Sequence, residues 1–265
     1  MPLESLKDRH ILILGGSDGM GYGVADYLLR SGAVVTIGAR TAAKLEAAGQ
    51  RLLRETGAAS DRLRVIAGDA CDAASVEKSV AAAANASGAV DGIFVVAGGG
   101  TFGAVTKNTP QSMADEWAAN LFPLVNAIAS AVPRMKAAGG SIVALSSGAG
   151  VRTYPGLSTY GACKAGLDHY VRVAADELGQ HRIRVNAVQP GLTKNGRNAD
   201  MLANKEYIST FDALTPLGPY GQPEDFGPLV SMLLRSESSW ITGQVFAVDG
   251  GMTLRAYGGR LQAPA

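Results

Sequence analysis

The chain alternates short apolar runs with longer stretches in which apolar positions recur at helical spacing. The apolar runs are nearly continuous and rich in β-branched residues, which is typical of strands buried on both faces of a parallel sheet. They fall at residues 10–14, 33–37, 64–67, 92–97, 141–145, 184–189 and 245–248. The stretches between them predict helices at 20–31, 41–56, 73–87, 111–137, 158–181 and 223–235.

This alternation of strands and helices predicts right-handed βαβ units in one doubly wound, mostly parallel sheet flanked by helices, a Rossmann-type α/β fold. No linker or low-complexity tract divides the chain, so we expect residues 1–265 to form a single domain. Residues 190–222 break the rhythm with many Pro, Gly and Asn residues and one weak helical stretch at 200–213. A long irregular segment in a compact α/β domain is typical of a binding loop or lid.

Composition excludes several classes of protein. Apolar residues make up 47% of the chain and charged residues 18%, and no apolar run is long enough to span a membrane. The first ten residues, MPLESLKDRH, do not resemble a secretory signal, and the only cysteines are Cys71 and Cys163. The net charge is +1 without a basic block, which argues against a nucleic-acid partner. We expect a cytoplasmic protein that binds no metal.

Residues 10–23, HILILGGSDGMGYG, run from a predicted buried strand into a helix through five glycines. In doubly wound sheets the diphosphate of a dinucleotide binds at this first turn, against the amides of the helix N-terminus. Glycines let the backbone and the phosphate approach closely, although a merely tight turn would also use them. We expect the dinucleotide to contact Gly15, Ser17, Asp18, Gly19, Met20 and Gly21.

The end of the second strand distinguishes the two nicotinamide cofactors. An acid there usually binds the ribose hydroxyls of NAD, whereas an arginine accommodates the 2′-phosphate of NADP. The segment reads VVTIGARTAAK, which has no acid, and Arg40 lies nineteen residues after Gly21. The pattern favours NADP(H), unless Arg40 only caps the next helix. Asp18 is an objection, because a carboxylate repels a phosphate.

Residues 158–166, STYGACKAG, place Tyr160 and Lys164 four positions apart on a predicted helix, so that both project from one face. The small neighbours leave room for a flat ligand. A free tyrosine has a pKa of about 10, and an adjacent ammonium favours the phenolate. The spacing by itself does not establish what the pair does. Cys163 lies inside the motif, and we interpret it as a packing residue.

These motifs resemble the short-chain dehydrogenase/reductase family, of the shorter single-domain type, over about residues 7–253. LGGSDGMG matches the family's Thr-Gly-x-x-x-Gly-x-Gly turn with Leu14 in place of threonine. Tyr160 and Lys164 match Tyr-x-x-x-Lys, and Ser147 lies thirteen residues before the tyrosine, as the family's catalytic serine does. Asn120 matches the asparagine of the central helix.

The resemblance is incomplete after the fourth strand, where Val95 and Val96 replace both asparagines of the family's Asn-Asn-Ala-Gly. It implies that Ser147 binds the substrate oxygen and that Asn120 holds a water that connects Lys164 to solvent. It also implies a homotetramer paired through residues 111–137 and 158–181. The further cofactor contacts that we expect are Asp69, Ala70, Ala97, Gly98, Tyr160, Lys164, Pro190, Gly191 and Thr193.

Residues 192–214 predict a lid over a substrate that is largely apolar around its carbonyl. The segment follows Pro190 and Gly191 at the carboxyl end of a strand, where ligands bind in doubly wound sheets. Its charged residues balance, so no strong anion site is expected. The substrate contacts that we expect are Ser147, Arg152, Tyr154, Tyr160, Leu192, Met201 and Phe211. These apolar residues could also pack the lid onto the core or onto another subunit.

Two functions compete. The motifs favour an NADP(H)-dependent oxidoreductase that interconverts a ketone and a secondary alcohol, with Asn120, Ser147, Tyr160 and Lys164 as the catalytic set. The alternative is a catalytically weak or inactive regulatory protein that keeps the fold and the cofactor, for which the two valines are the main support.

Overall fold

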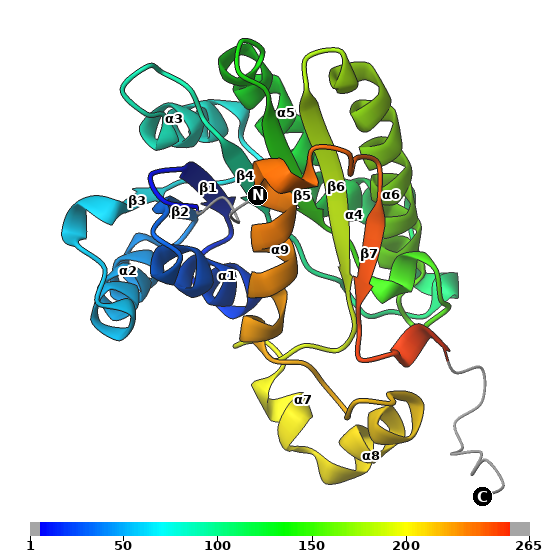
Figure 1. Cartoon of the computed structure of the whole chain (residues 1–265). Helices are drawn as coiled ribbons and strands as arrows, with labels where there is room; N and C mark the ends of the chain where they lie inside the picture. Colours follow the sequence, from blue (N-terminus) through cyan, green and yellow to red (C-terminus); the bar gives the residue numbers. More distant parts are fainter. Residues whose placement is uncertain (1–5, 255–265) are drawn as a thin grey trace, which may run out of the picture.

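The computed structural model describes residues 6–254, and these contain one sheet of seven parallel strands (Figure 1). The strands are β1 (His10–Leu14), β2 (Val34–Ala39), β3 (Leu63–Ala67), β4 (Gly92–Val95), β5 (Gly140–Leu145), β6 (Ile183–Pro190) and β7 (Val245–Val248). Their order is β3-β2-β1-β4-β5-β6-β7, so the direction of winding reverses between β1 and β4. The predicted doubly wound sheet is confirmed. A ligand crevice is expected where the winding reverses, outside the carboxyl ends of the strands.

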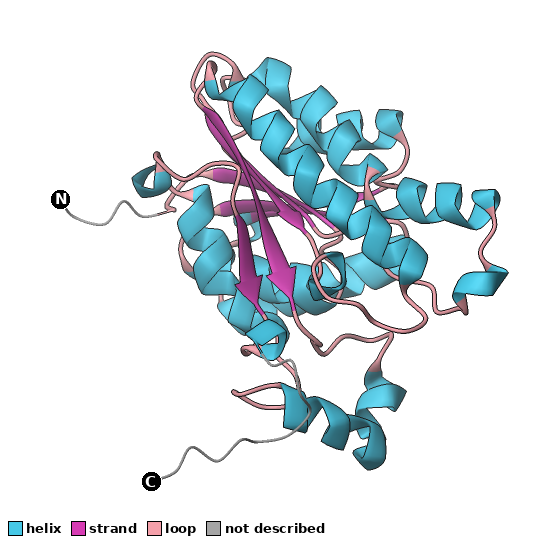
Figure 2. Cartoon of the chain, turned by 90° about the vertical axis from the view of Figure 1, so that its right-hand side faces the viewer, coloured by secondary structure: helices cyan, strands magenta, loops and turns pink. Residues whose placement is uncertain are grey.

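Helices cover both faces of the sheet, as Figures 1 and 2 show. The helices are α1 (Gly19–Arg30), α2 (Ala42–Thr56), α3 (Ala73–Ala83), α4 (Pro110–Asn120), α5 (Phe122–Met135), α6 (Ser158–Gly179), α7 (Ala199–Ala203), α8 (Lys205–Leu214) and α9 (Gly227–Leu234). One apolar core lies between the sheet and α3, α5 and α6, and a second lies between the sheet and α1, α2 and α9.

The continuous apolar runs are explained by these two cores. In β1, Ile11 and Ile13 belong to the core under α1 and α9, whereas Leu12 and Leu14 belong to the opposite core. Successive side chains of a strand point to opposite faces. Because both faces of this sheet are covered, each of the four positions has to be apolar.

The predicted helix at 111–137 is wrong as a single element, because the chain forms α4 and α5 with a break at Leu121. Pro123 lies in the first turn of α5 and has no N–H to bond the carbonyl of Ala119. Asn120 therefore stands at the end of α4, where its side chain is free to bind outside the helix. The predicted end of α3 also moves, from residue 87 to Ala83, and the Asn85 side chain accepts from amides of the turn that follows.

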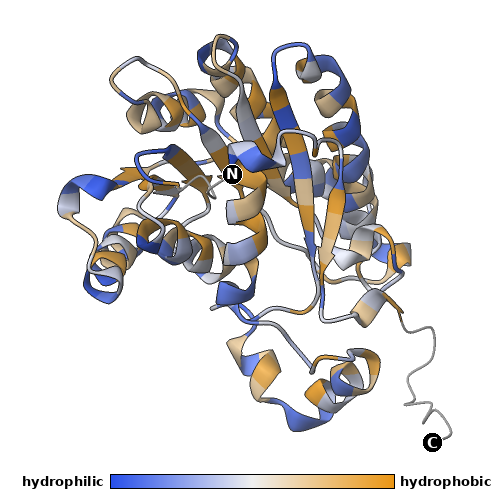
Figure 3. Cartoon of the chain, viewed as in Figure 1, coloured by the Kyte–Doolittle hydropathy of each residue, from blue (hydrophilic) through white to orange (hydrophobic). Residues whose placement is uncertain are grey.

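The predicted lid segment contains two short helices rather than one weak helix. Asn204 separates α7 from α8 and caps α8, because its side chain accepts from the Tyr207 amide at 3.1 Å. The two helices contain no fully buried residue. They lie below the body of the molecule in Figure 1, and Figure 3 shows hydrophobic positions on both.

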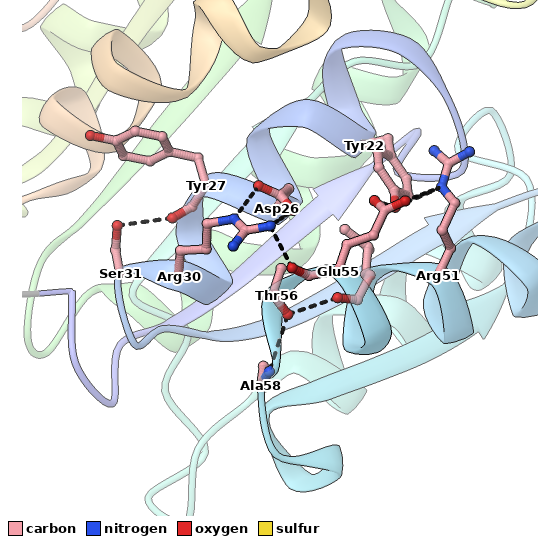
Figure 4. A network of polar contacts seen from close by, with 10 residues as sticks. Tyr22, Asp26, Tyr27, Arg30, Ser31, Arg51, Glu55, Thr56 and Ala58 are labelled. Carbon is pink, nitrogen blue, oxygen red and sulfur yellow. Dashed lines mark hydrogen bonds and ion pairs between the residues drawn. The ribbon is translucent and has the colours of Figure 1, made fainter.

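A polar network on the outside of the molecule joins α1 to α2 (Figure 4). The Tyr22 hydroxyl donates to Glu55 at 2.6 Å and accepts from Arg51 Nε at 2.7 Å, and the Arg51 guanidinium carbon lies 3.8 Å from the centre of the Tyr22 ring. Burial and the Glu55 hydrogen bond raise the pKa of Tyr22 to about 12. This network fixes α2, whose first turn faces the carboxyl edge of the sheet.

Candidate active site

A large cavity opens at the carboxyl edge of the sheet, where the winding reverses. Its volume is about 1050 Å³, and its walls come from the segments that follow β1, β2, β3, β4, β5 and β6. It contains both the glycine-rich turn and the Tyr160–Lys164 pair. Residues that are far apart in the sequence thus line one cavity, whose volume is at the upper end of the range of about 300–1,000 Å³ that is typical of small-molecule pockets.

The glycine-rich turn between β1 and α1 forms one end of the cavity. Gly15 and Gly19 have φ values of +105° and +52°, in the region that favours glycine. A Cβ on Gly21 would lie 2.2 Å from the Gly15 carbonyl oxygen, so Gly21 permits close packing inside the turn and does not itself line the cavity. The residues of this turn that line it are Gly15, Ser17, Asp18, Gly19 and Met20.

The charge of Asp18 is compensated within the chain. Its carboxylate accepts from the Gly19 amide at 2.8 Å and from the Gly196 amide at 3.2 Å, and it pairs with Lys44 Nζ at 2.9 Å. Burial acts to raise the pKa of Asp18, but the Lys44 ammonium and the two amides outweigh it and hold the pKa below the usual value. The electrostatic objection raised by the sequence is therefore weakened by a lysine that the sequence analysis missed.

Basic and acidic side chains follow β2 and β3 at the same end. Arg40 is exposed in the cavity wall and makes no ion pair within residues 6–254. The Asp69 carboxylate accepts from the Cys71 amide at 2.9 Å, which closes a tight turn. Asp69, Ala70 and Cys71 all line the cavity.

The loop after β4 carries the two valines that depart from the family pattern. Val95 is 4% exposed and packs into the core, whereas Val96 lines the cavity with Ala97 and Gly98. The Val96 and Ala97 amides both donate to the Leu14 carbonyl, at 2.8 and 3.0 Å. Backbone hydrogen bonds therefore hold this loop against the glycine-rich turn.

The Asn120 side chain, at the end of α4, binds the same loop through hydrogen bonds. Its side-chain oxygen accepts from the Gly99 amide at 3.0 Å, and its Nδ2 donates to the Gly99 and Glu116 carbonyls, each at 3.0 Å. Asn120 is 1% exposed and does not line the cavity. Its side chain thus positions the 98–99 loop, and its role in holding a water stays a prediction.

Tyr160 and Lys164 line the same cavity as the glycine-rich turn, and Ser147 lines it beside them. Ser147 lies two residues after the end of β5, and its hydroxyl acts on the Tyr160 phenol to lower that group's pKa. Lys164 Nζ lies 5.6 Å from the centre of the Tyr160 ring and donates to the Leu145 carbonyl at 2.8 Å. One helix and one strand end thus bring a hydroxyl, a phenol and an ammonium together.

The small residues around this pair serve packing as well as access. A Cβ on Gly161 would lie 2.7 Å from the Ala149 carbonyl oxygen, and one on Gly166 would lie 2.7 Å from the Trp117 ring. A Cβ on Gly100 would lie 3.0 Å from the Tyr160 ring. The glycines of α6 therefore let it approach the 148–150 turn and α4, and Gly100 is the one that leaves space over the phenol.

Burial controls the protonation of both groups. It raises the pKa of Tyr160, and the Ser147 hydrogen bond and the positive charge of Arg197 offset it only in part. Burial also lowers the pKa of Lys164 to about 8. The expectation that Lys164 favours the phenolate stays a prediction, but in the protein by itself loss of solvation is the larger effect and the net shift of the Tyr160 pKa is upward.

The end of β6 and the lid form the remaining wall. Pro190, Gly191 and Leu192 line the cavity, as do Tyr154, Met201 and Phe211. The Thr193 side chain is turned into its own loop, where the hydroxyl donates to the Gly191 carbonyl at 3.2 Å. Arg152 donates to the Met252 carbonyl and does not line the cavity.

Arg197 is the cationic residue of the lid that the sequence analysis did not select. It lines the cavity, and its Nη2 donates to the Gly98 carbonyl at 3.0 Å. The sequence carried no signal for this contact, because it depends on how the lid folds back across the sheet edge. Within the described residues no group of three metal-ligating side chains is present, and no helix is long and apolar enough to cross a membrane.

Comparisons with known proteins agree with this arrangement. A family model described as enoyl-(acyl carrier protein) reductase matches residues 15–253. A tropinone reductase homolog of Arabidopsis thaliana is 33% identical over 258 residues, which cover 96% of this chain and 95% of that protein. A 3-oxoacyl-[acyl-carrier-protein] reductase of Chlamydia muridarum is 31% identical over 257 residues, 93% of this chain and 98% of that protein.

A solved structure is also similar over nearly the whole chain. A short-chain type dehydrogenase/reductase from Mycobacterium ulcerans superposes with a TM-score of 0.89 at 33% identity. The match covers 95% of this chain and 92% of that one.

Proposed function

Because the chain belongs to the short-chain dehydrogenase/reductase family of oxidoreductases, we propose that it interconverts a ketone and a secondary alcohol with NADP(H). The observation that carries this proposal is the joint position of Ser147, Tyr160 and Lys164 in the cavity that also contains the glycine-rich turn. A dinucleotide bound at that turn would extend toward the phenol.

The chain's own residues supply the proton and hold the substrate. When bound, the nicotinamide gives or takes the hydride. The Ser147 hydroxyl binds the substrate oxygen and keeps it next to the phenol. In the direction of reduction, Tyr160 donates its proton to that oxygen as negative charge develops there. Lys164 stabilises the phenolate that results, and burial of both groups strengthens this attraction.

The preference for NADP(H) rests on the charges at the glycine-rich end. Arg40 stands in the cavity wall after β2 with no ion-pair partner among residues 6–254, and the end of that strand carries no acid. Lys44, one helical turn further, offsets the charge of Asp18. A 2′-phosphate would give Arg40 a partner, whereas the ribose hydroxyls of NAD would find no carboxylate there.

The substrate lies between the catalytic end and the lid. Tyr154, Leu192, Met201 and Phe211 offer it mostly apolar contacts. Arg152 acts indirectly in this proposal, because its guanidinium donates to the Met252 carbonyl and so holds Met252 in place. The Tyr154 hydroxyl lies 3.6 Å from the Met252 sulfur, so Arg152 helps to position Tyr154. Residues 192–214 then close over the site and exclude water from the hydride path.

The proposed protein is a cytoplasmic homotetramer that acts on a small carbonyl or alcohol. Phe122 on α5 and Val173 on α6 are 47% and 42% exposed. Apolar side chains on these helices support the proposal that the two helices pair between subunits.

A spectrophotometric panel tests the proposed reaction. Oxidation of NADPH and NADH at 340 nm is followed with ketones of graded size, and the reverse reaction with the matching alcohols. We expect turnover with NADPH and a loss of more than tenfold in Tyr160→Phe, because the hydroxyl that donates the proton is removed. The Kd for NADPH by calorimetry should stay nearly constant, because the rest of the side chain is unchanged.

The same panel separates the enzyme from the regulatory alternative. A wild-type protein that binds NADPH but reduces no ketone would favour a cofactor-binding regulator with Val95 and Val96 at the sheet end. Retention of more than a tenth of the rate in Tyr160→Phe would show that another group donates the proton.

A further inference from the structure

The lid, residues 192–214, has equal numbers of positive and negative side chains, but those that line the cavity are not balanced. The charged residues between 192 and 214 are Lys194, Arg197, Asp200, Lys205, Glu206 and Asp212. Arg197 is the one member of this set that lines the cavity in the described structure. The balance that predicted no strong anion site therefore does not hold where a ligand would bind.

Arg197 reaches from the lid across the cavity to the loop after β4. Its Nη2 donates to the Gly98 carbonyl at 3.0 Å, and its Nη1 lies 2.1 Å from the position that a Cβ on Gly99 would take. The guanidinium thus occupies space that exists because residue 99 is a glycine. Its charge acts on the Tyr160 phenol, whose pKa burial raises and Arg197 partly lowers.

No carboxylate in the cavity wall neutralises this guanidinium. The acids of the wall are Asp18, which pairs with Lys44, and Asp69, which accepts from the Cys71 amide. Within residues 6–254 the Arg197 side chain has one hydrogen bond and no ion pair. A guanidinium offers five N–H donors in a planar fork that matches a carboxylate, so most of its capacity is left for a ligand.

We propose that Arg197 binds a carboxylate of the substrate beside the reacting carbonyl, so that the substrates are oxo acids with an apolar body and the corresponding hydroxy acids. The inference rests on the proposed function and narrows its substrate class. Met201, Tyr207 and Phe211 belong to the same lid, line the cavity and would contact the apolar body. Paired N–H donors would fix the carboxylate and thereby orient the carbonyl toward Tyr160.

The diphosphate of the cofactor is the competing source of an oxyanion. The residues that precede Arg197 lie nearest to the glycine-rich turn, because the Gly196 amide donates to Asp18 and a Cβ on Gly19 would lie 3.1 Å from the Asn195 Cβ. Residues 195–196 thus contact the glycine-rich turn, whereas the Arg197 side chain reaches the Gly98 carbonyl and its charge acts on Tyr160. This order favours the substrate as the partner of Arg197.

The test compares matched acids and esters. Phenyl-substituted 2-, 3- and 4-oxo acids and their ethyl esters are assayed with NADPH in the wild type, Arg197→Met and the control Lys194→Met, an exposed lysine of the same segment. We expect Arg197→Met to lower kcat/KM about 10- to 100-fold for at least one acid and less than threefold for its ester. Lys194→Met should change neither, and the Kd for NADPH by calorimetry should be unchanged in all three proteins.

Gly99→Ala provides a second variant that retains the charge. The added methyl group would displace the guanidinium, a flexible side-chain end, so the acid should lose its advantage over the ester as in Arg197→Met. Equal losses for acid and ester would overturn the inference and leave the proposed reductase standing. A weakened Kd for NADPH would assign Arg197 to the diphosphate instead. A wild type that reduces no carbonyl would refute the proposed function itself.

Discussion

Replacing Lys164 by methionine should abolish turnover and yet stabilise the fold at neutral pH. Lys164 is 2% exposed, and burial lowers its pKa from 10.5 to about 8. At about 1.36 kcal/mol per pKa unit, keeping this ammonium charged in the folded protein costs about 3 kcal/mol below pH 8. Methionine removes that cost and fills a similar volume.

One loss opposes this gain. The Leu145 carbonyl gives up the 2.8 Å hydrogen bond from Nζ, which contributes about 1.5 kcal/mol. The variant should therefore be more stable than the wild type by about 1–2 kcal/mol at pH 7. The same lysine would be needed for turnover, so the wild type gives up stability for function.

The pH dependence gives this prediction a definite sign. Between pH 8 and 10.5 the unfolded wild type keeps the Lys164 proton and the folded protein has lost it, so wild-type stability from this group rises with pH. The stabilisation of Lys164→Met should shrink over this range and change sign near pH ~9. Urea denaturation at pH 7, 8, 9 and 10 measures it at one protein concentration, with the exposed Lys78→Met as the control. A variant that is less stable at pH 7, or a difference that is constant with pH, would refute the reasoning.

Three further outcomes test the cofactor end, the lid and the assembly. Arg40→Ala should raise the KM for NADPH about 10- to 100-fold and leave that for NADH almost unchanged, since a charge-assisted bond to the 2′-phosphate is worth about 1.5–3 kcal/mol; equal losses in steady-state assays would make Arg40 structural. Limited proteolysis within 192–214 should be fast in the free protein, because α7 and α8 bury no residue completely, and slowed by NADPH with substrate; an unchanged rate would contradict a lid. Light scattering at micromolar concentration should give the mass of a tetramer, and a monomer would exclude it.

The sheet could be predicted because strands that are buried on both faces are nearly continuous apolar runs in the sequence. Each strand is a nearly continuous apolar run, and its limits were predicted within two residues. The helices were harder to delimit, since their ends depend on single residues. Pro123 divides the predicted 111–137 helix, and this proline in the NLFP sequence at 120–123 is the signal for the break. The turn at Asn85 ends α3 early through side-chain bonds to the backbone.

The candidate site was predictable where its geometry is local. Tyr160 and Lys164 share one helix, and the glycines of the first turn are adjacent in the sequence, so spacing alone indicated their common face. The contacts of Lys44 with Asp18 and of Arg197 with Gly98 join segments far apart in the sequence. No periodicity encodes such pairs. The net direction of the Tyr160 pKa could not be predicted for a related reason, because it depends on how far the fold removes the phenol from water.

The two tryptophans of the chain occupy opposite environments. Trp117 is partly buried on α4 and packs against Gly166 of α6. It lies about one helical turn before Asn120, whose side chain binds the 98–99 loop. Trp240 is 98% exposed.

An indole in water emits at longer wavelength than one packed among side chains, and an anionic quencher in solution reaches it more easily. Iodide should therefore quench the emission of Trp240 first and leave a blue-shifted remainder from Trp117. The protein thus contains an internal fluorescence comparison, in which the Trp117 emission reports on the packing of α4 against α6 while the Trp240 emission serves as a reference.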